Sequence, residues 1–253
     1  MDRWIELDGA VNVRDLGGLP TDDGGTTAPG VLLRSDNLQG LSDKDVRRLV
    51  DDHGTRTVLD LRTPTEVTLE GPGPLVAEGL RHVNLDLIPT WDAADGSSDR
   101  IVPHEQREEG DLSHFYLTYL DQMPQSVVAA LRVLADPASG SVVVHCAAGK
   151  DRTGVIVALA LSLVGVKRPA VVADYALSGE RISAIRDRLV ATPLYSEDIS
   201  RRTVDSMRPH AGNMERFLDR VDREYGGIHG LAMAVGVDEE TVGRLGRRLL
   251  ADH

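Results

Sequence analysis

The chain has 253 residues, of which 41% are hydrophobic and 27% charged, and its 28 basic and 40 acidic residues give a net charge of −12. The hydrophobic share supports a sizeable core and excludes a disordered or fibrous chain. The acidic balance disfavours general binding to nucleic acid or to anionic membranes, because both present negative phosphates. The single cysteine excludes disulfides within the chain and zinc sites built from several thiolates.

No segment approaches the apolar length of a membrane span, and the opening residues MDRWIE lack the apolar core of a signal peptide. We therefore expect a cytoplasmic protein without a stable membrane anchor, with export without a cleaved signal as the open alternative. No repeat, low-complexity tract or linker divides the chain, so residues 1–253 are expected to form a single domain. The sequence indicates no particular oligomeric state.

The first half of the chain alternates short apolar runs with helical patterns. Strands are predicted at residues 31–33, 57–61, 83–87 and 141–145, and helices at 42–52, 112–122 and 125–135. Ser42 and Asp45 are placed to cap the first of these helices, and Thr63 and Glu66 form a capping box for another. Residues 88–110 form a polar, Asp-rich loop whose length indicates function or mobility rather than mere connection.

After Thr153 every periodic pattern is helical. Six helices are predicted, at residues 154–164, 169–177, 180–191, 196–207, 212–225 and 238–250. Strands that alternate with helices, followed by helices alone, indicate an α/β fold. We expect a central, mainly parallel sheet flanked by helices, with a helical C-terminal elaboration.

Residues 145–154 read HCAAGKDRTG and carry the most informative chemistry. An apolar strand runs into this loop and an apolar helix runs out of it. Such a junction binds anions, because unpaired backbone N–H groups and the positive end of the helix dipole meet there. The small side chains of Ala147, Ala148 and Gly149 let the backbone curl closely around a phosphate.

Cys146 lies where a thiolate is favoured, at a helix N-terminus with Lys150 and Arg152 nearby, and only the thiolate is a good nucleophile. The planar fork of Arg152 can grip two oxygens of a phosphoryl group above the sulfur. Thr153 is placed to donate its hydroxyl towards the sulfur. His145 is expected to orient the loop through hydrogen bonds rather than to act as a base.

Two other interpretations of the loop carry less weight. A lone buried cysteine is often a small apolar core residue. The Gly149-Lys150 pair resembles part of a nucleotide-binding loop, but Asp151 follows it and no glycine lies five positions before Gly149. A cysteine, five residues and Arg-Thr-Gly between a strand and a helix form a more specific pattern, which favours a thiolate that acts on phosphate.

With these residues the loop resembles the Cys-X5-Arg loop of the protein tyrosine phosphatase superfamily. The motifs NVRDLGG at 12–18, LRSD at 33–36, DLR at 60–62 followed by Glu66, and ADY at 173–175 are similar to its bacterial branch, which includes mycobacterial tyrosine phosphatases. The resemblance thus covers nearly the whole chain. It implies that Cys146 is the nucleophile and Arg152 the phosphate clamp, in a cradle formed by Ala147, Ala148, Gly149, Lys150 and Arg152.

The resemblance implies a cysteine-dependent phosphatase that hydrolyses phosphotyrosine in proteins through a phosphocysteine intermediate, without a cofactor or metal. Phosphoserine, phosphothreonine and phosphoinositides are the expected extensions. Lys150-Asp151 is similar to loops of lipid-directed members, where an extra cation meets additional phosphates; the alternative is that Lys150 holds the loop.

Two alternative functions are a phosphate-recognition module without catalysis and a sulfur- or arsenate-handling enzyme. The presence of Cys146, Arg152, Thr153 and a candidate acid weighs against the first. The lack of a second cysteine weighs against the other.

Expulsion of a phenolate or an alkoxide requires a proton donor. In the bacterial branch the aspartate inside the loop has this role, which implies Asp151 here. Asp86 and Asp92 are the alternatives. Trp91-Asp92 is the segment most similar to the Trp-Pro-Asp loop of the eukaryotic enzymes, but no proline separates its two residues.

Residues 168–225 are expected to include a helical lid over the pocket, since a helical pair has this role in the resembling branch, with Gly165 and Gly179 as hinges. Arg14 and Arg62 are expected in structural pairs with acidic neighbours, which are Asp15, Asp60 and Glu66.

Two further features have simple structural interpretations. The spacing of His104, Glu105 and His114 fits no metal motif, and a solvated loop is expected there. Residues 231–242 have the rhythm of a helix-turn-helix and are followed by three arginines, Arg244, Arg247 and Arg248. The negative charge balance favours a helical hairpin packed on the domain over DNA binding.

Overall fold

The computed structural model describes residues 3–88 and 111–251. Within them the sheet has five strands in the order β1-β2-β5-β3-β4. The bounds are β1 Arg14–Asp15, β2 Leu32–Ser35, β3 Thr55–Asp60, β4 Arg81–Asn84 and β5 Ser141–His145. Strands β2, β5, β3 and β4 run parallel, and β1 pairs antiparallel with β2. The predicted mainly parallel sheet is confirmed; β1 was not predicted, because two residues carry no periodic signal.

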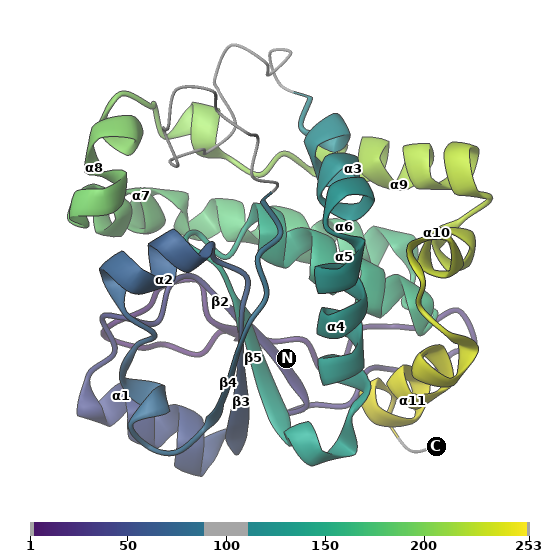
Figure 1. Cartoon of the computed structure of the whole chain (residues 1–253), viewed down its shortest axis with the longest axis horizontal. Helices are drawn as coiled ribbons and strands as arrows, with labels where there is room; N and C mark the ends of the chain where they lie inside the picture. The colour runs from purple at the N-terminus through teal and green to yellow at the C-terminus, as the bar shows by residue number, and fades with distance from the viewer. Residues whose placement is uncertain (1–2, 89–110, 252–253) are drawn as a thin grey trace.

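Helices flank this sheet and then continue alone (Figure 1). The α-helices before β5 and the loop that follows it are α1 Asp43–Arg47, α2 Pro64–Glu70, α3 Ser113–Gln122 and α4 Pro124–Ala135. Those after it are α5 Asp151–Leu163, α6 Arg168–Leu177, α7 Ile182–Val190, α8 Pro193–Ser200, α9 Ala211–Tyr225, α10 Ile228–Val235 and α11 Glu239–Leu249. Figure 1 shows α7 and α8 together on one side of the molecule and α10 and α11 on the other. The helical C-terminal elaboration is therefore confirmed.

Both predicted capping boxes form, at Ser42 before α1 and at Thr63 before α2. The helix predicted at 196–207 is wrong in its bounds. Its α-helical part, α8, begins at Pro193, whose fixed φ suits the first turn, and ends at Ser200. Only a short 3-10 turn follows, at Asp205–Met207. The helix predicted at 42–52 is likewise shorter, because α1 passes into a π-helical turn after Arg47.

The central strands β2 and β5 are buried on both faces. In β5, Val142 and Val144 belong to one hydrophobic cluster and Val143 to the other, and all three side chains are fully buried. This alternation follows from the two-residue period of a strand, and a β-branched run is what a strand covered on both faces requires. Burial of each valine contributes about 2 kcal/mol.

The sheet brings the functional segments to one edge, because the carboxyl ends of parallel strands lie side by side. β5 is central, and its last residue, His145, is in register with Ser35 of β2 and Asp60 of β3. The residues that follow these strands therefore converge on the loop after β5, as expected for a binding site in a sheet of this type. Among the described residues no helix combines the length and apolar character needed to cross a membrane.

Candidate active site

The loop between β5 and α5 approaches β2 closely at Gly149. This glycine has a φ of +65°, and a Cβ added to it would lie 2.2 Å from the carbonyl oxygen of Ser35. Only glycine has both the conformational freedom and the lack of bulk that this approach needs. Helix α5 begins at Asp151, earlier than the predicted residue 154, so its first turn forms part of the loop.

Carbonyl groups of the loop are held from behind by buried side chains. The Nδ2 atom of Asn12 donates to the carbonyls of Ala148 and Gly149 at 3.1 and 3.2 Å. Arg34 Nη2 donates to the Gly149 carbonyl at 2.7 Å. Both Asn12 and Arg34 are fully buried, so these bonds are made in surroundings where an unpaired partner would be costly.

A third carbonyl, that of Ala147, accepts from the backbone N–H of Asn37 at 3.0 Å. Because the C=O and N–H of a trans peptide point in opposite directions, the N–H groups after these three carbonyls face the other way. They are the N–H groups of Ala148, Gly149 and Lys150. The loop thus presents successive donors on its concave side, which is an arrangement suited to an anion.

Asp174 of α6 holds the arginines behind the loop. Its Oδ2 accepts from Arg34 at 2.7 Å, and its Oδ1 accepts from Arg14 at 3.0 Å and from Arg3 at 2.9 Å. Arg14 also donates to Asn12 Oδ1 at 2.6 Å. Burial opposes ionisation of Asp174, but the three guanidinium groups hold its pKa below the ordinary value.

The two arginines singled out in the sequence both form buried pairs. Arg62 pairs with Asp60 at 2.6 Å, as expected. Arg14 pairs with Asp174 and not with its neighbour Asp15. The reason is local, because the Asp15 carboxylate accepts from the backbone N–H groups of two turn glycines, at 2.8 and 2.7 Å.

Cys146 begins the loop directly after β5, and its side chain is 2% exposed. It lies before the N-terminus of α5, whose first turn carries Arg152. The Thr153 hydroxyl is buried and has no hydrogen-bond partner among the residues that the structure describes, so its proton is available for the sulfur.

His145 is fully buried beside Cys146. Its Nδ1 lies 3.2 Å from the Cys146 carbonyl oxygen, and its Nε2 lies 3.6 Å from Asp60 Oδ2. Burial lowers the pKa of His145 to about 4, so the imidazole is neutral at pH 7. This geometry suits a residue that orients the loop, which is the role expected from the sequence.

Arg152 forms a bidentate ion pair with Glu66 that was not predicted from the sequence. Its Nη1 and Nη2 donate to the two carboxylate oxygens of Glu66 at 2.6 and 2.9 Å, and Nη1 also donates to the Leu61 carbonyl at 3.2 Å. Burial opposes ionisation of Glu66, but Arg152 and hydrogen bonds from Thr63 and Tyr195 lower the pKa of Glu66 to about 2. The sequence signals at Glu66 were the capping box, which fixes it at the start of α2, and its place after the DLR motif, and neither indicated Arg152 as its partner.

Those three bonds use three of the five N–H donors of Arg152. The two that remain, on Nε and Nη2, lie side by side along the other edge of the guanidinium. This adjacent pair matches two oxygens of a phosphoryl group. Glu66 therefore fixes the plane of Arg152 and leaves one fork for a ligand.

Two of the three candidate proton donors lie among the described residues. Asp151 Oδ1 accepts from the Tyr116 hydroxyl at 2.7 Å, and its Oδ2 lies 3.4 Å from Lys150 Nζ. Asp86 follows β4 at the same edge of the sheet, and burial raises its pKa. Asp92 lies outside the described residues.

Lys150 is 8% exposed and donates through Nζ to the Met207 carbonyl at 2.6 Å. The lysine therefore ties the loop to the segment before α9. This contact fits the alternative interpretation of Lys150, in which it holds the loop, and the predicted contact of Lys150 with phosphate stays a prediction.

The remaining sequence features lie apart from this loop. His114 is on α3 and contacts Arg220, whereas His104 and Glu105 fall outside the described residues. No metal-binding group of three His, Cys, Asp or Glu side chains occurs within residues 3–88 and 111–251. The segment with helix-turn-helix rhythm forms α10 and α11, and Arg248 donates to backbone carbonyls at the end of α4, so it is a packed helical hairpin.

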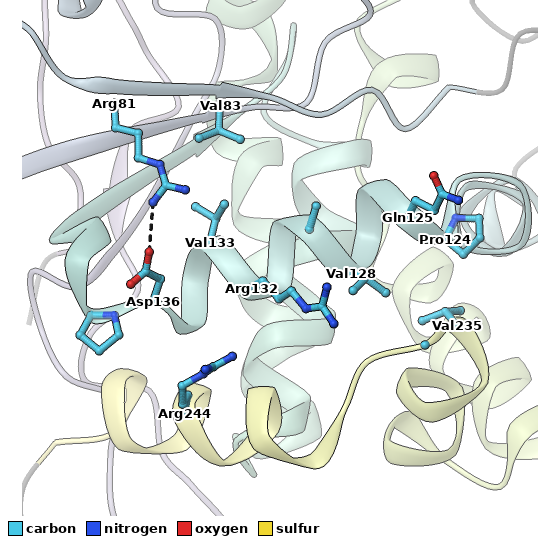
Figure 2. A pocket seen from close by; sticks show the side chains of 13 residues that line it. Arg81, Val83, Pro124, Gln125, Val128, Arg132, Val133, Asp136, Val235 and Arg244 are labelled. Carbon is cyan, nitrogen blue, oxygen red and sulfur yellow. Dashed lines mark hydrogen bonds and ion pairs between the residues drawn. The ribbon is translucent and has the colours of Figure 1, made fainter.

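A groove of about 720 Å³ lies between β4, α4, α10 and α11 (Figure 2). Its apolar lining includes Val83, Val128 and Val133, and the arginines along it are Arg81, Arg132 and Arg244. These arginines pair, in that order, with Asp136, Asp238 and Glu240. In each pair the positive charge of the arginine is balanced by the carboxylate. The lining of the groove includes no residue of the loop between β5 and α5.

The chain is similar to several known proteins. Residues 5–251 match the model of the tyrosine phosphatase family. The chain is 32% identical to the triple specificity protein phosphatase PtpB of Mycobacterium tuberculosis, over 95% of this chain and 96% of that protein. It is 25% identical to a tyrosine-protein phosphatase of Nostoc commune, over 86% and 74% of the two chains. The core catalytic domain of the PP-IP phosphatase SIW14 from S. cerevisiae aligns with a TM-score of 0.37 and 15% identity, over 82% of this chain and 95% of that one.

The Glu66–Arg152 pair gives a prediction for stability against pH. Because the pKa of Glu66 falls from 4.5 to about 2 in the folded chain, the pair stabilises the fold fully above pH 4.5 and less as the pH approaches 2. Glu66→Gln is expected to lower the free energy of unfolding by up to about 3 kcal/mol near neutral pH, and by progressively less in acid. Urea unfolding across this range measures the difference, with Glu197→Gln in an exposed pair as the control. A difference that stays constant with pH would contradict the assignment.

Proposed function

Because the chain belongs to the tyrosine phosphatase family, we propose that Cys146 and Arg152 carry out its phosphate-ester hydrolysis in two steps at the loop after β5. The chain is a protein-tyrosine phosphatase, a hydrolase of phosphoric monoesters. The observation that carries the proposal is that the carbonyls of Ala147, Ala148 and Gly149 accept hydrogen bonds from behind the loop, which turns the next N–H groups towards its other face.

In the first step the Cys146 thiolate attacks phosphorus, and the S–P bond forms as the bond to the ester oxygen breaks. The backbone N–H groups and the free fork of Arg152 bind the phosphoryl oxygens, where negative charge is spread in the transition state. Asp151 gives its proton to the departing oxygen, so that a phenol or an alcohol leaves.

In the second step water attacks the phosphocysteine. The Asp151 carboxylate takes a proton from this water, the P–O bond forms and the S–P bond breaks. Thr153 donates its hydroxyl to the departing thiolate, and inorganic phosphate is released. Neither step requires a metal ion, since the charge is balanced by protein donors alone.

We propose phosphotyrosine in proteins as the first substrate, with phosphoserine, phosphothreonine and phosphoinositides as extensions. Family membership supports the first choice. The name of the M. tuberculosis relative, a triple specificity protein phosphatase, supports a wider range. A loop with one general phosphate cradle also suits several phosphate esters, because its donors contact the phosphoryl group rather than the leaving group.

Residues 1–253 are proposed to act as a single phosphatase domain, with α7 and α8 as its lid. Side chains from this pair and from the turn after it, Ile182, Ile185, Leu189, Tyr195, Ile199 and Met207, pack in one cluster with Ala147 of the loop. Arg188 of α7 pairs with Asp36 at 3.0 Å, and Tyr195 of α8 donates to Glu66 at 2.7 Å. Gly165 and Gly179 remain the proposed hinges.

A cytoplasmic location is proposed on the chemistry of the thiol. A reducing compartment keeps a lone catalytic cysteine in its active form, because no second cysteine is present to protect it as a disulfide.

Phosphate release tests the proposed function directly. Wild type in EDTA is expected to release phosphate from a phosphotyrosine peptide, and Cys146→Ser is expected to lose about a thousandfold or more, since a serine hydroxyl is not ionised at neutral pH. Parallel assays with a phosphoserine peptide and phosphoinositide micelles measure the range. A wild type that binds phosphate tightly but releases none from any of these substrates would instead indicate a recognition module.

The proposed lid predicts an effect of Tyr195→Phe, which removes one hydrogen bond between α8 and Glu66. Cleavage by a protease within residues 182–200 is expected to become several-fold faster, and saturation with orthovanadate to slow it. Tyr225→Phe is the matched control, because Tyr225 also donates to a carboxylate but does so on α9. Equal cleavage rates for both variants, with no effect of orthovanadate, would contradict a lid.

A further inference from the structure

We propose that Tyr116 is a positioning residue for the general acid, because its hydroxyl selects the oxygen of Asp151 that carries the transferable proton. The proposal rests on the proposed function, in which Asp151 protonates the leaving group. Tyr116 Oη donates to Asp151 Oδ1 at 2.7 Å. With Oδ1 occupied as an acceptor, the proton of the neutral acid is carried by Oδ2.

The hydroxyl of Tyr116 has a second partner, and the direction of that second bond follows from the first. Tyr116 and Tyr175 hydroxyls lie 2.7 Å apart. Since the single proton of Tyr116 goes to Asp151, Tyr175 must donate to Tyr116. The Tyr175 hydroxyl in turn hydrogen-bonds the Asn213 side chain. A chain of bonds therefore runs from α9 through α6 and α3 to the loop.

Burial keeps both tyrosines protonated. It raises the pKa of Tyr116 well above the ordinary value, with the charge of Asp151 as the next cause, and it raises that of Tyr175 as well. Tyr116 is therefore protonated at neutral pH and can donate its hydroxyl proton to Asp151. Lys150 Nζ lies 3.4 Å from Asp151 Oδ2.

Packing holds the Tyr116 ring in place. Its centroid lies 6.2 Å from that of Tyr175 and 5.9 Å from that of Phe217, both edge-on, and the side chain is 1% exposed. Edge-to-face aromatic contacts at these distances favour one orientation of the ring. The hydroxyl is thus aimed at Asp151 by residues from two other helices, α6 and α9, and not only by its own rotamer.

The test compares two aryl phosphates of similar size, phenyl phosphate and p-nitrophenyl phosphate. The first has a basic leaving group that needs a proton, and the second leaves readily without one. Tyr116→Phe is expected to lower kcat/KM about tenfold more for phenyl phosphate than for p-nitrophenyl phosphate, as loss of one hydrogen bond to the acid implies. The basic limb of its pH–rate profile is expected to move to higher pH, because the variant loses a bond that favours the carboxylate.

Tyr175→Phe is the matched comparison, since it removes a hydroxyl from the same aromatic cluster that lies one hydrogen bond farther from Asp151. The ratio of its kcat/KM values for the two aryl phosphates is expected to change less than that of Tyr116→Phe. In the Asp151→Asn background Tyr116→Phe is expected to have no further effect on that ratio, because the acid that it positions is absent.

The outcomes separate the two claims. If Tyr116→Phe lowers activity equally for both substrates, or still changes the ratio in the Asp151→Asn background, Tyr116 has only a structural role and the inference is overturned. If Asp151→Asn itself lowers activity equally for both substrates, then the assignment of the acid fails first, and Asp86 becomes the residue to test. Thermal unfolding of each variant shows whether the fold is retained.

Discussion

The hydrogen bonds that turn the loop carbonyls away from Cys146 are the interactions on which the site depends. Without Asn12 and Arg34 behind the loop, carbonyl oxygens could face the sulfur and repel both a thiolate and a phosphate. Arg34 is itself held by Asp174, and Asn12 is held through Arg14, because Asp174 accepts from three arginines in one network. Burial of such charges is costly, and the network is tolerated because nearly every charge in it has a partner.

Helix α6 links this network to Asp151, the proposed proton donor. Asp174 and Tyr175 are neighbours on it, and the first supports the phosphate cradle while the second supports Tyr116 and, through it, Asp151. The helices after the loop are therefore part of the site and not a separate appendage. On the other side of the loop, Tyr195 of α8 reaches Arg152 through Glu66.

The sequence predicted the features that depend on local signals. The strand–loop–helix junction, both capping boxes and the mainly parallel sheet follow from residues close together in the chain, and each is confirmed by the structure. The contacts that it did not reveal join distant residues, namely Glu66 with Arg152, Arg14 with Asp174, and Tyr116 with Asp151. No periodicity or spacing marks such pairs, because they are set by how helices pack against the sheet. The bounds of α8 were wrong for a similar reason, since residues 201–204 looked helical although the chain turns there.

The central claim is that hydrolysis passes through a phosphoryl group bound to Cys146. Trapping that species in the Asp151→Asn variant with p-nitrophenyl phosphate tests it most directly, because this substrate forms the intermediate readily and the variant lacks the base that would hydrolyse it. After a rapid acid quench and proteolysis, mass spectrometry is expected to find the added phosphoryl group on the peptide that contains Cys146. A variant that releases p-nitrophenol while this peptide remains unmodified, or carries the group on another residue, would contradict the account.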